Sequence, residues 1–517
     1  MMSLSQQCSI SLSVLLADFV VQDNCPDVDI KGITLDSRQV QAGDLFVAIK
    51  GAEADGTAFI PQAIERGAVA ILVEKEQALE PQGNNSVPVI GIEKLAEYVS
   101  DIAGVFYGHP SKQMALTAIT GTNGKTTCAH LYAELVDRLN KGSAASIGTL
   151  GYGMAGSSSG AEIPALGEAG LTTPDAVAMQ RILAELKSKG ASTVALEVSS
   201  HSLVQRRVAG LQVDTAVFTN LSRDHLDYHG DLASYAAAKA RLFAMTGLKN
   251  AVINIDDSIG RLILANLDPN IRAITYSIEA QEEGGTADIY CRTIGLSPEG
   301  LRAAIHTPWG EGELRSPLLG KFNLANLLAV IGAAIAQGFA LEDILKAVPN
   351  LRAVSGRMEL VDAGASPSVV VDYAHTPDAL EKALQALRVH CHGELWVVFG
   401  CGGDRDIGKR AEMGAIAETC ADQVVVTSDN PRSEDPQQII NQIVQGTRRE
   451  VIVDSDRRAA IRQAILAADK NDVVLIAGKG HEDYQILGAQ RLPFSDQGEA
   501  RLALRAREAL DLNGGLA

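Results

Sequence analysis

The sequence predicts an α/β protein of three domains. These are a smaller N-terminal α/β domain, a central P-loop-type domain with a doubly wound, mostly parallel sheet, and a C-terminal domain with a Rossmann-like sheet. The length of 517 residues suits about three domains. Apolar, β-prone runs alternate with helical patterns, which is typical of parallel sheets covered by helices. A glycine-punctuated turn near residue 121 joins one such run to a helical pattern.

Composition and charge exclude several classes of protein. The chain is 46% hydrophobic and 21% charged, as is usual for soluble enzymes. Its net charge of −18 argues against a nucleic-acid partner, which needs a basic face. The 7 cysteines are scattered without a CxxC pair. We therefore expect reduced thiols, a cytoplasmic location and no cysteine zinc site.

Neither a signal peptide nor a membrane span is expected. Asp18 interrupts the N-terminal apolar run, and no Lys or Arg precedes Lys31. The most apolar long stretch, 324–336, contains Asn326 and is too short for a bilayer, so it predicts a buried helix. We expect a monomer that has small-molecule partners and no membrane insertion.

The N-terminal domain is predicted to span 1–110. Strands are expected at 32–38 and 44–49, on either side of a turn at Gly43. A helix over 59–67 and a buried strand over 68–73 follow. Glycine and proline at 108–110 indicate a linker to the next domain.

A phosphate-binding loop opens the central domain, predicted at 111–352. An apolar strand pattern ends at Gly121, and a helical pattern begins near Lys125. The backbone N–H groups of such a turn cradle phosphate, the lysine reaches the β/γ-phosphates, and the Thr126 hydroxyl can hold Mg²⁺. A strict eight-residue P-loop would have glycine in place of Ile119, so the loop is an abbreviated form. The alternative is an ordinary strand-to-helix turn.

The central domain contains further candidates. Strands are expected at 193–198, 215–219 and 251–255. The segment 151–170 is expected to be a loop, because it is too long and too rich in glycine and serine for a core element. Glu197 ends the first of these strands, where a carboxylate either holds Mg²⁺ or is a satisfied, half-buried glutamate.

Two more residues of this domain have open interpretations. His225, in a polar run after the strand at 215–219, is either a metal ligand or a cap. Lys239 lies amid alanines of a helical pattern, and the local sequence alone predicts a solvated lysine.

The C-terminal domain, predicted at 353–517, repeats the alternation of strands and helices. A polar or glycine-rich cluster follows each of its expected strands, which are 368–371, 395–399, 423–427 and 473–476. Ligands bind outside the carboxyl ends of strands in such sheets. Any one cluster alone is more often a turn, but four together predict a binding site.

Several motifs resemble the Mur ligase family. The segments that carry the resemblance are 35–38 (LDSR), 43–48 (GDLFVA), 121–127 (GTNGKTT), 197–201 (EVSSH), 372–378 (DYAHTPD) and 429–432 (DNPR). They match in the right order over nearly the whole chain. The first two are similar to the uridine-nucleotide-binding domain of one member, which adds diaminopimelate.

The resemblance implies formation of an amide bond driven by ATP. The γ-carboxylate of UDP-N-acetylmuramoyl-L-alanyl-D-glutamate would take a phosphoryl group from ATP. The amine of meso-diaminopimelate would then attack the acyl phosphate, in peptidoglycan precursor synthesis. The implied cofactors are ATP and Mg²⁺, and closure of the domains over the substrates is expected.

Three other functions stay open at this point: a lysine-adding Mur ligase, a folylpolyglutamate synthase-like ligase and a P-loop switch protein. Segment 35–38 argues against the folate enzyme. A switch protein would not need a further domain with four polar strand ends.

The resemblance also implies roles for individual residues. Contacts to the UDP-sugar are implied for Leu35, Ser37, Ala52, Glu53 and Ala54. Contacts to the muramoyl dipeptide are implied for Thr172, Thr173, Ser199, Gln205 and Arg207. Contacts to ATP are implied for Gly121, Thr122, Asn123, Gly124, Lys125, Thr126, Thr127, Asn323, Arg357 and Asp372. Contacts to the incoming amino acid are implied for Arg405, Asp429, Asn430, Pro431, Arg432, Gly478 and Glu482. The implied Mg²⁺ ligands are Thr126, Glu197, His225 and a carbamylated Lys239; the implied catalytic residues are Lys125, Lys239, Glu197 and His225.

Overall fold

The computed structural model describes most of the chain. The described residues are 9–20, 26–51, 55–77, 87–140, 142–156, 167, 171–222, 224–279, 287–297, 300–362 and 366–514. They form two compact units. The first contains Met1–Thr275 and Gly332–Gly338, and the second contains Tyr276–Ile331 and Phe339–Ala517.

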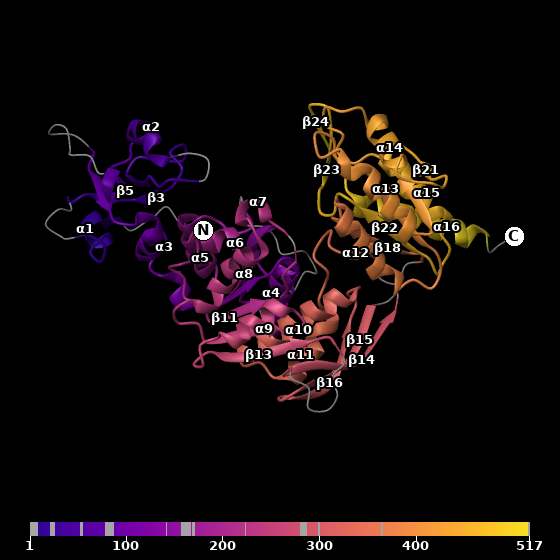
Figure 1. Ribbon diagram of the computed structural model, residues 1–517, viewed down its shortest axis with the longest axis horizontal. Coiled ribbons are helices and arrows are strands. Elements are labelled where there is room, and N and C mark those ends of the chain that lie inside the picture. Colours follow the sequence, from indigo (N-terminus) through magenta and orange to yellow (C-terminus); the bar gives the residue numbers. More distant parts are fainter. Residues whose placement is uncertain are drawn as a thin grey trace. The chain divides into compact units, whose positions relative to one another are not determined.

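The first unit begins with a small parallel sheet (Figure 1). Its strands, in spatial order, are β3 (Gly32–Thr34), β4 (Asp44–Val47), β5 (Ala70–Glu74) and β6 (Val89–Ile92). An antiparallel pair, β1 (Ile10–Ser11) and β2 (Asp29–Ile30), accompanies it, with helices α1 (Leu12–Leu15), α2 (Ile60–Glu65) and α3 (Leu95–Phe106). Successive residues of β5 enter different apolar clusters, so the sheet is covered on both faces.

The predicted strand at 32–38 is shorter in the structure. It ends at Thr34 because Asp36 makes a turn, in which its Oδ1 accepts the N–H of Arg38 at 2.9 Å. Helix α3 packs on α5 (Ala176–Ser188) of the same unit, where Gln180 Nε2 donates to the carbonyl oxygen of Ser100 at 3.1 Å. The N-terminal sheet is thereby fixed to the sheet that follows.

That larger sheet is mostly parallel. Within the first unit its strand order is β12 (Asn250–Asn254), β11 (Thr215–Phe218), β7 (Ala115–Thr120), β10 (Thr193–Glu197), β8 (Ala144–Gly148) and β9 (Gly151–Met154). The helices between these strands are α4 (Lys125–Asn140), α5, α6 (Ser200–Val204), α7 (Leu226–His229), α8 (Leu232–Ala240) and α9 (Ser258–Ala265). Strand β7 lies between β10 and β11, so the carboxyl ends of these three strands share one edge.

One prediction for this region is wrong in part. The Gly/Ser-rich segment at 151–170 was expected to lie outside the core elements, yet Gly151–Met154 forms β9, antiparallel to β8. A tight turn after Gly148 allows the pairing, because Gly151 has a φ of 99°. The buried ring of Tyr152 then packs as a strand side chain.

The second unit contains an antiparallel meander and a six-stranded sheet. The meander consists of β14 (Ile289–Ser297), β15 (Gly300–Thr307) and β16 (Gly310–Ser316), and β13 (Arg272–Ser277) crosses the boundary between the units. Helix α10 (Lys321–Ala336), whose last residues from Gly332 belong to the first unit, and helix α11 (Leu341–Ala347) follow. The predicted buried helix over 324–336 is confirmed, since it forms most of α10 and its apolar side chains are buried.

The six-stranded sheet has the order β17 (Glu359–Val361), β18 (Ser368–Asp372), β22 (Val473–Ala477), β19 (Leu395–Phe399), β20 (Gln423–Val426) and β21 (Ile452–Val453). Only β17 is antiparallel to its neighbour. Helices α12 (Pro377–Arg388), α13 (Gly408–Cys420) and α14 (Pro436–Val444) cover one face, and α15 (Arg457–Ala467) and α16 (Asp496–Gly514) cover the other (Figure 1). A hairpin of β23 (Tyr484–Leu487) and β24 (Gln490–Pro493) follows β22.

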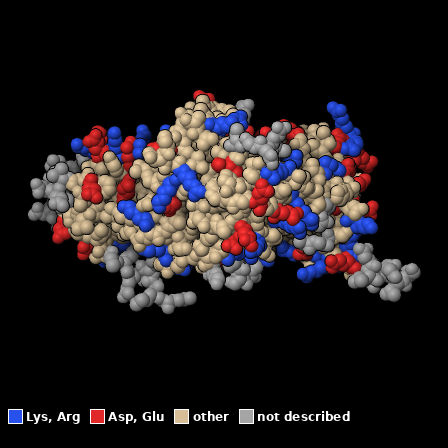
Figure 2. Space-filling model, turned by 90° about the horizontal axis from the view of Figure 1, so that it is seen from below, with Lys and Arg blue, Asp and Glu red and all other residues tan. Residues whose placement is uncertain are grey.

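Two surface properties complete the description. Basic and acidic side chains are interspersed over the face shown in Figure 2, rather than gathered into one basic field. Among the described helices, none is long and apolar enough to cross a bilayer. The predicted boundaries 1–110, 111–352 and 353–517 stay predictions.

Candidate active site

The phosphate loop joins β7 to α4. Gly121 and Gly124 have φ values of 153° and 87°, which side chains disfavour. A Cβ on Gly121 would lie 1.9 Å from Thr219 Oγ1, so only glycine fits there. The N–H of Asn123 donates to Asn220 Oδ1 at 3.0 Å. The end of β11 thus braces the loop at the N-terminus of a 16-residue helix, where anions bind well.

Two lysines meet at this loop. Lys125 Nζ donates to the carbonyl oxygens of Gly121 and Thr122 at 2.9 and 2.8 Å. Lys239 Nζ donates to the same Gly121 oxygen at 2.7 Å and lies 4.5 Å from the centre of the Tyr235 ring. Two amino groups therefore converge where a phosphate would bind.

The prediction of a solvated Lys239 from local sequence is wrong. Its residue is only 1% exposed, because the alanine face of α8 packs closely and carries the lysine inward. Burial, followed by the charge of Lys125, lowers the pKa of Lys239 to about 6, although Asp224 partly opposes the shift. At neutral pH the amine is largely unprotonated.

Glu197 and Thr126 form the second part of the site. Thr126 Oγ1 donates to Glu197 Oε2 at 2.9 Å, and the N–H of Thr149 donates to Oε1 at 2.8 Å. Glu197 is 1% exposed, so it is not the half-buried glutamate considered above. Burial raises its pKa, while the charge of Lys125 and the hydrogen bonds from Thr149 and Thr126 pull it down. Hard oxygen donors beside a phosphate loop fit Mg²⁺.

Gly148 makes room for that carboxylate. A Cβ on Gly148 would lie 2.0 Å from Glu197 Oε1. The local sequence offered one sign of this contact: Gly148 and Thr149 follow β8 directly, at the same edge as the loop. Sequence reasoning missed both residues.

His225 precedes helix α7, and its side chain makes no capping hydrogen bond there. It is exposed, has a φ of 52°, and its Nε2 is 3.4 Å from Asp224 Oδ2. Its ring is 4.9 Å from that of His201 and 6.1 Å from that of Tyr235. Within the described residues, no three His, Cys, Asp or Glu side chains form a metal site, so a threonine hydroxyl or a modified lysine would have to contribute.

The five residues implied for the muramoyl dipeptide do come together. Thr173 Oγ1 donates to the carbonyl oxygen of Glu197 at 2.9 Å and accepts the N–H of Ser199 at 3.0 Å. Arg207 donates to the carbonyl oxygen of Thr173 at 2.8 Å and to Gln205 Oε1 at 2.9 Å. Thr172 joins them through Thr149, with 3.3 Å between the hydroxyl oxygens. The cluster is continuous with the Glu197 site.

The residues implied for the UDP-sugar lie at the N-terminal sheet. Ser37 is buried and its Oγ donates to Gln62 Oε1 at 2.7 Å, while Leu35 is half-buried against the apolar cluster of that sheet. Ala52, Glu53 and Ala54 lie outside the described residues.

The second unit holds the other residues implied for ATP. Asp372 accepts the N–H groups of Met358 and Ala374 at 2.7 and 2.9 Å, and burial raises its pKa against the charge of Arg357. The Arg357 guanidinium stacks 4.9 Å from the Tyr373 ring. Asn323 is buried in α10 and donates to the carbonyl oxygen of Leu319 at 2.8 Å.

The residues implied for the amino acid gather at the ends of β20 and β22. Asn430 Nδ2 donates to Glu482 Oε2 at 2.8 Å. Gly478, with a φ of 118°, is needed because a Cβ there would lie 2.7 Å from Asp429 Oδ2. Arg432 has a φ of 52° and donates to the carbonyl oxygen of Gly403 at 2.9 Å, whereas Arg405 is exposed.

The β23–β24 hairpin holds this cluster in place. Gln485 Nε2 donates to the carbonyl oxygen of Asp429 at 2.7 Å, and the N–H of Ile486 donates to Asn430 Oδ1 at 3.0 Å. The N–H of Arg432 donates to the carbonyl oxygen of Ile486 at 3.1 Å. Sequence reasoning missed this support, as well as the fully buried Lys479 beneath the cluster.

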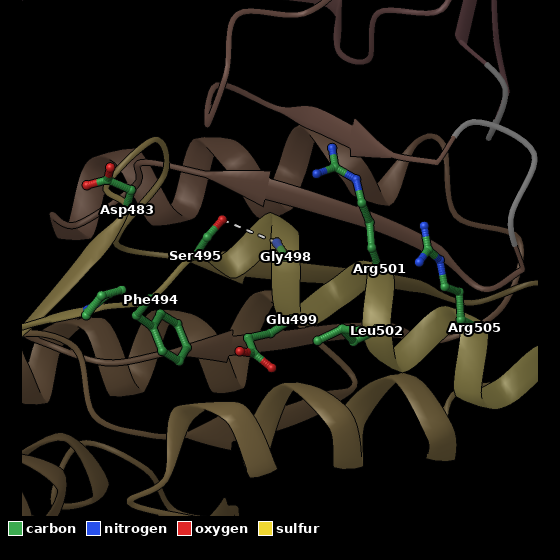
Figure 3. Close-up of a pocket in the computed structure, with 9 residues that line it drawn as sticks. Asp483, Phe494, Ser495, Gly498, Glu499, Arg501, Leu502 and Arg505 are labelled. Atoms are coloured by element: carbon green, nitrogen blue, oxygen red, sulfur yellow. Dashed lines mark hydrogen bonds between the residues drawn. The ribbon is translucent and has the colours of Figure 1, made fainter.

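A surface hollow nearby is a different feature. It has a volume of about 520 Å³ and is lined mainly by the start of α16 and the end of the hairpin, with Arg501 and Arg505 along it (Figure 3). Arg501 Nε is 3.7 Å from Asp362 Oδ1. None of the residues predicted for the site lines it.

Comparison with known proteins agrees with the geometry. Three family models match: "Mur ligase family, catalytic domain" at 29–107, "Mur ligase middle domain" at 119–334, and "Mur ligase, glutamate ligase domain" at 356–480. The UDP-N-acetylmuramoyl-L-alanyl-D-glutamate–2,6-diaminopimelate ligase of Pseudomonas putida strain KT2440 is 49% identical over 489 residues, covering 93% of this chain and 96% of that protein. The chain belongs to the Mur ligase family.

Further relatives support the assignment to the Mur ligases. The ligase of the same name from Pseudomonas aeruginosa is 50% identical over 484 residues, with 93% and 96% coverage. A solved structure of an enzyme of that name has a TM-score of 0.75 and 37% identity, and covers 97% of this chain and 100% of that one. The predicted family and fold class are thereby confirmed. The folylpolyglutamate synthase of Mycobacterium tuberculosis, 19% identical with a TM-score of 0.57 and covering 79% of this chain and 95% of that one, shares the fold alone.

We predict that Gly148→Ala strongly reduces Mg²⁺-dependent turnover of ATP. The added methyl group would displace the Glu197 carboxylate, on whose oxygen it would fall. Loss of one charge-stabilising group commonly costs about 10²- to 10³-fold in rate. Steady-state rates measured over a range of Mg²⁺ concentrations would show the loss.

Gly295→Ala is the matched control, because a Cβ at that strand position meets only the Arg302 carbonyl oxygen, at 4.0 Å. Equal rates for the two variants and the wild type would show that Glu197 has no role in the Mg²⁺-dependent turnover of ATP.

Proposed function

We propose that this Mur ligase joins meso-diaminopimelate to UDP-N-acetylmuramoyl-L-alanyl-D-glutamate at the expense of ATP. The observation that carries the proposal is about 50% identity, over 93% of the chain, to ligases named for this reaction. The buried cluster of Lys125, Lys239, Glu197 and Thr126 at the phosphate loop supports it. The product would enter peptidoglycan synthesis.

The first half-reaction activates a carboxylate. The γ-carboxylate of the D-glutamyl residue attacks the γ-phosphorus of ATP, the bond to the β-phosphate oxygen breaks, and an acyl phosphate and ADP form. Both reactants are anions, so the site must offset their repulsion. The N-terminus of α4 and the Lys125 ammonium, once it leaves the carbonyl oxygens of its own loop, supply positive charge where the phosphoryl group transfers.

The donor set at the loop fits Mg²⁺. Thr126 and Glu197 would hold the ion, and His225 would assist from the neighbouring loop. When bound, Mg²⁺ neutralises phosphate charge and orients the nucleotide. The hydrogen bonds from Thr126 and Thr149 already orient the Glu197 oxygens for this task.

Lys239 would provide a further oxygen ligand as a carbamate. Its neutral amine attacks CO₂, an N–C bond forms, and a proton leaves to solvent. Burial next to Lys125, which lowers the pKa of Lys239 to about 6, supplies the neutral amine that this step needs. The carbamate would replace the buried Lys239 amine. Among the described contacts, that amine has no carboxylate within hydrogen-bonding distance.

The second half-reaction uses the amino-acid cluster of the other unit. The amine of diaminopimelate attacks the acyl carbonyl, and inorganic phosphate leaves. Arg432 is the candidate for the far carboxylate, because an arginine fork binds a carboxylate in two places, and Arg405 is the second candidate. Glu482, which Asn430 Nδ2 orients, would hold the far ammonium.

Substrate placement and location complete the proposal. Leu35 and Ser37 would contact the UDP end, and the Thr173–Arg207 cluster the peptide end beside Glu197. We also propose a cytoplasmic monomer. The described cysteines Cys128, Cys291, Cys391, Cys401 and Cys420 are free thiols, as suits a reducing compartment.

A panel of substrates tests the function. We predict phosphate release that requires both the UDP-muramoyl dipeptide and an amine, with meso-diaminopimelate used far better than L-lysine. A site built around a paired polar group rejects an analogue that lacks it. Lys125→Ala, expected to lose about 10²- to 10³-fold in rate, serves as the inactive control. Phosphate release without either substrate would favour the switch protein, and a preference for lysine would favour the lysine-adding enzyme.

We predict that Arg432→Ala raises the KM for meso-diaminopimelate and leaves the KM for ATP unchanged. A hydrogen bond to a charged group contributes about 1.5–3 kcal/mol, which corresponds to about 10- to 150-fold in KM. Arg491→Ala is the matched control, since Arg491 stacks on the Tyr484 ring of the adjoining hairpin. An unchanged KM in Arg432→Ala would assign the far carboxylate to another residue.

We predict a carbamate on Lys239 in ¹³C-bicarbonate buffer above about pH 6, where the amine is neutral because its pKa is lowered to about 6. A ¹³C carbonyl signal should grow as the pH rises through that value. It should be absent from Lys239→Arg and present in Lys249→Arg, which alters an exposed lysine paired with Asp214. Acetate or formate should partly restore the activity of Lys239→Ala. A signal that persists in Lys239→Arg would refute the assignment.

A further inference from the structure

Five charged side chains are packed together within and behind the amino-acid cluster. Lys479 is fully buried, and its Nζ donates to Asn430 Oδ1 and Glu482 Oε2, both at 3.1 Å. The same nitrogen is 3.6 Å from Asp429 Oδ1. Behind them, Arg457 forms a bidentate ion pair with Asp496, with both N–O distances 2.7 Å and both side chains fully buried.

Lys479 fixes the groups that face the amino acid. Its bonds to Asn430 and Glu482 leave neither side chain free to turn, and Asn430 Nδ2 closes the triangle by donating to the same Glu482 oxygen at 2.8 Å. Arg457 reinforces the base, because its Nη2 donates to the carbonyl oxygen of Ala477 at the end of β22 at 3.0 Å. The orientation of Glu482 therefore depends on a lysine that the substrate does not have to touch.

The network does not balance in charge. Asp429, Glu482 and Asp496 are three carboxylates, whereas Lys479 and Arg457 are two cations. One negative charge is in surplus, and because Asp429 and Asp496 are buried while Glu482 is only partly exposed, an unpaired charge is costly there. Burial is the main cause of a raised pKa at Asp429; Arg457 and Lys479 pull this pKa down, and Glu482 and Asp496 add to the rise.

We propose that Lys479 is a positioning residue in a network with one surplus negative charge, and that the far ammonium of diaminopimelate supplies the missing positive charge in place of a proton. This inference rests on the proposed function, because it needs an amino acid with a second ammonium group. The contacts assigned above say where the far ammonium binds. The surplus charge gives the reason why a cation is selected over a neutral group.

The exchange of a proton for the far ammonium determines how binding of diaminopimelate depends on pH. Below the pKa of Asp429 in the free protein, the network holds a proton, and the ammonium must displace it to solvent. Binding of the ammonium therefore weakens as the pH falls and reaches a plateau above that pKa. The charged groups that face Asp429 are Arg457, Lys479, Glu482 and Asp496; Tyr373 and Cys401 also lie near it, and both have raised pKa values that keep them neutral at neutral pH.

A pair of substrates isolates this effect. L-2-Aminopimelate has the reacting amine and both carboxylates of diaminopimelate but lacks the far amine. The ratio of kcat/KM for meso-diaminopimelate to that for L-2-aminopimelate cancels the ionisation of groups common to both reactions. At high pH we expect this ratio to be about 10-fold or more. As the pH falls below the pKa of Asp429, the ratio should decrease, with a slope that approaches tenfold per pH unit. A ratio independent of pH would overturn the inference.

Variants test the role of Lys479. Lys479→Met should raise the KM for diaminopimelate, leave the KM for ATP unchanged, and move the fall of the ratio to higher pH, because Asp429 loses a neighbouring positive charge. Lys479→Arg, which keeps the charge, should keep the fall near its wild-type pH. Arg388→Met, which removes an ion pair with Asp422 before β20, is the matched control and should leave both KM values and the ratio unchanged. If Lys479→Met changed the KM for ATP and the KM for diaminopimelate equally, the role of Lys479 would be structural only.

Asp429→Asn covers the case in which Lys479→Met does not fold. It removes the titrating carboxylate, so the ratio should fall in size and lose its pH dependence; a dependence that survives would overturn the inference. The two proposals fail differently. If the wild type forms no product from diaminopimelate, both fall, whereas product formation with a pH-independent ratio removes only the network.

Discussion

The carbonyl oxygen of Gly121 is the point on which the phosphate site depends. It accepts hydrogen bonds from Lys125 and Lys239, and the backbone there can take this conformation only as glycine, because Thr219 occupies the space of a Cβ. The loop, the helix N-terminus and the inward lysine of α8 are therefore set by one backbone position. A larger residue at 121 would disturb all three at once, since the sheet edge behind it cannot move without breaking the β7–β11 pairing.

Much of the fold could be predicted from sequence because its signals are local. Apolar runs of four to six residues became β7, β10, β19 and β22 with nearly the expected bounds, and the loop after β7 was evident from its glycines. Burial of Lys239 could not be predicted from local sequence, because alanine neighbours are equally compatible with a solvated helix and with close packing. Only the resemblance to the Mur ligases pointed to that lysine. Strand β9 was missed for a related reason: its glycines suggested a loop, and its partner β8 supplies the order.

The residues that hold the site in place could not be predicted from the sequence, for a different reason. Gly148 meets Glu197 across 49 positions of chain, and Arg457 meets Asp496 across 39. No periodicity or motif links such pairs; the first is brought together by the pairing of β8 with β10, and the second by the packing of α15 on α16. Most residues proposed to touch substrates lie in recognisable motifs, whereas those that hold them in place are scattered. Lys479 lies next in sequence to Gly478, which is proposed to bind the amino acid, yet its hydrogen bonds run to Asn430 and Glu482, so position in the sequence does not separate these roles.

The two units use buried lysines in opposite ways. Lys239 is desolvated beside another lysine, with a carbonyl oxygen and an aromatic ring as its close contacts, and this environment favours the neutral amine that can react with CO₂. Lys479 is buried among an amide and two carboxylates, to which it forms hydrogen bonds and ion pairs. The same side chain is thus proposed to be a nucleophile in one setting and a fixed counter-charge in the other. The neighbouring carboxylates make this difference, and burial alone does not, because both residues are equally shielded from water.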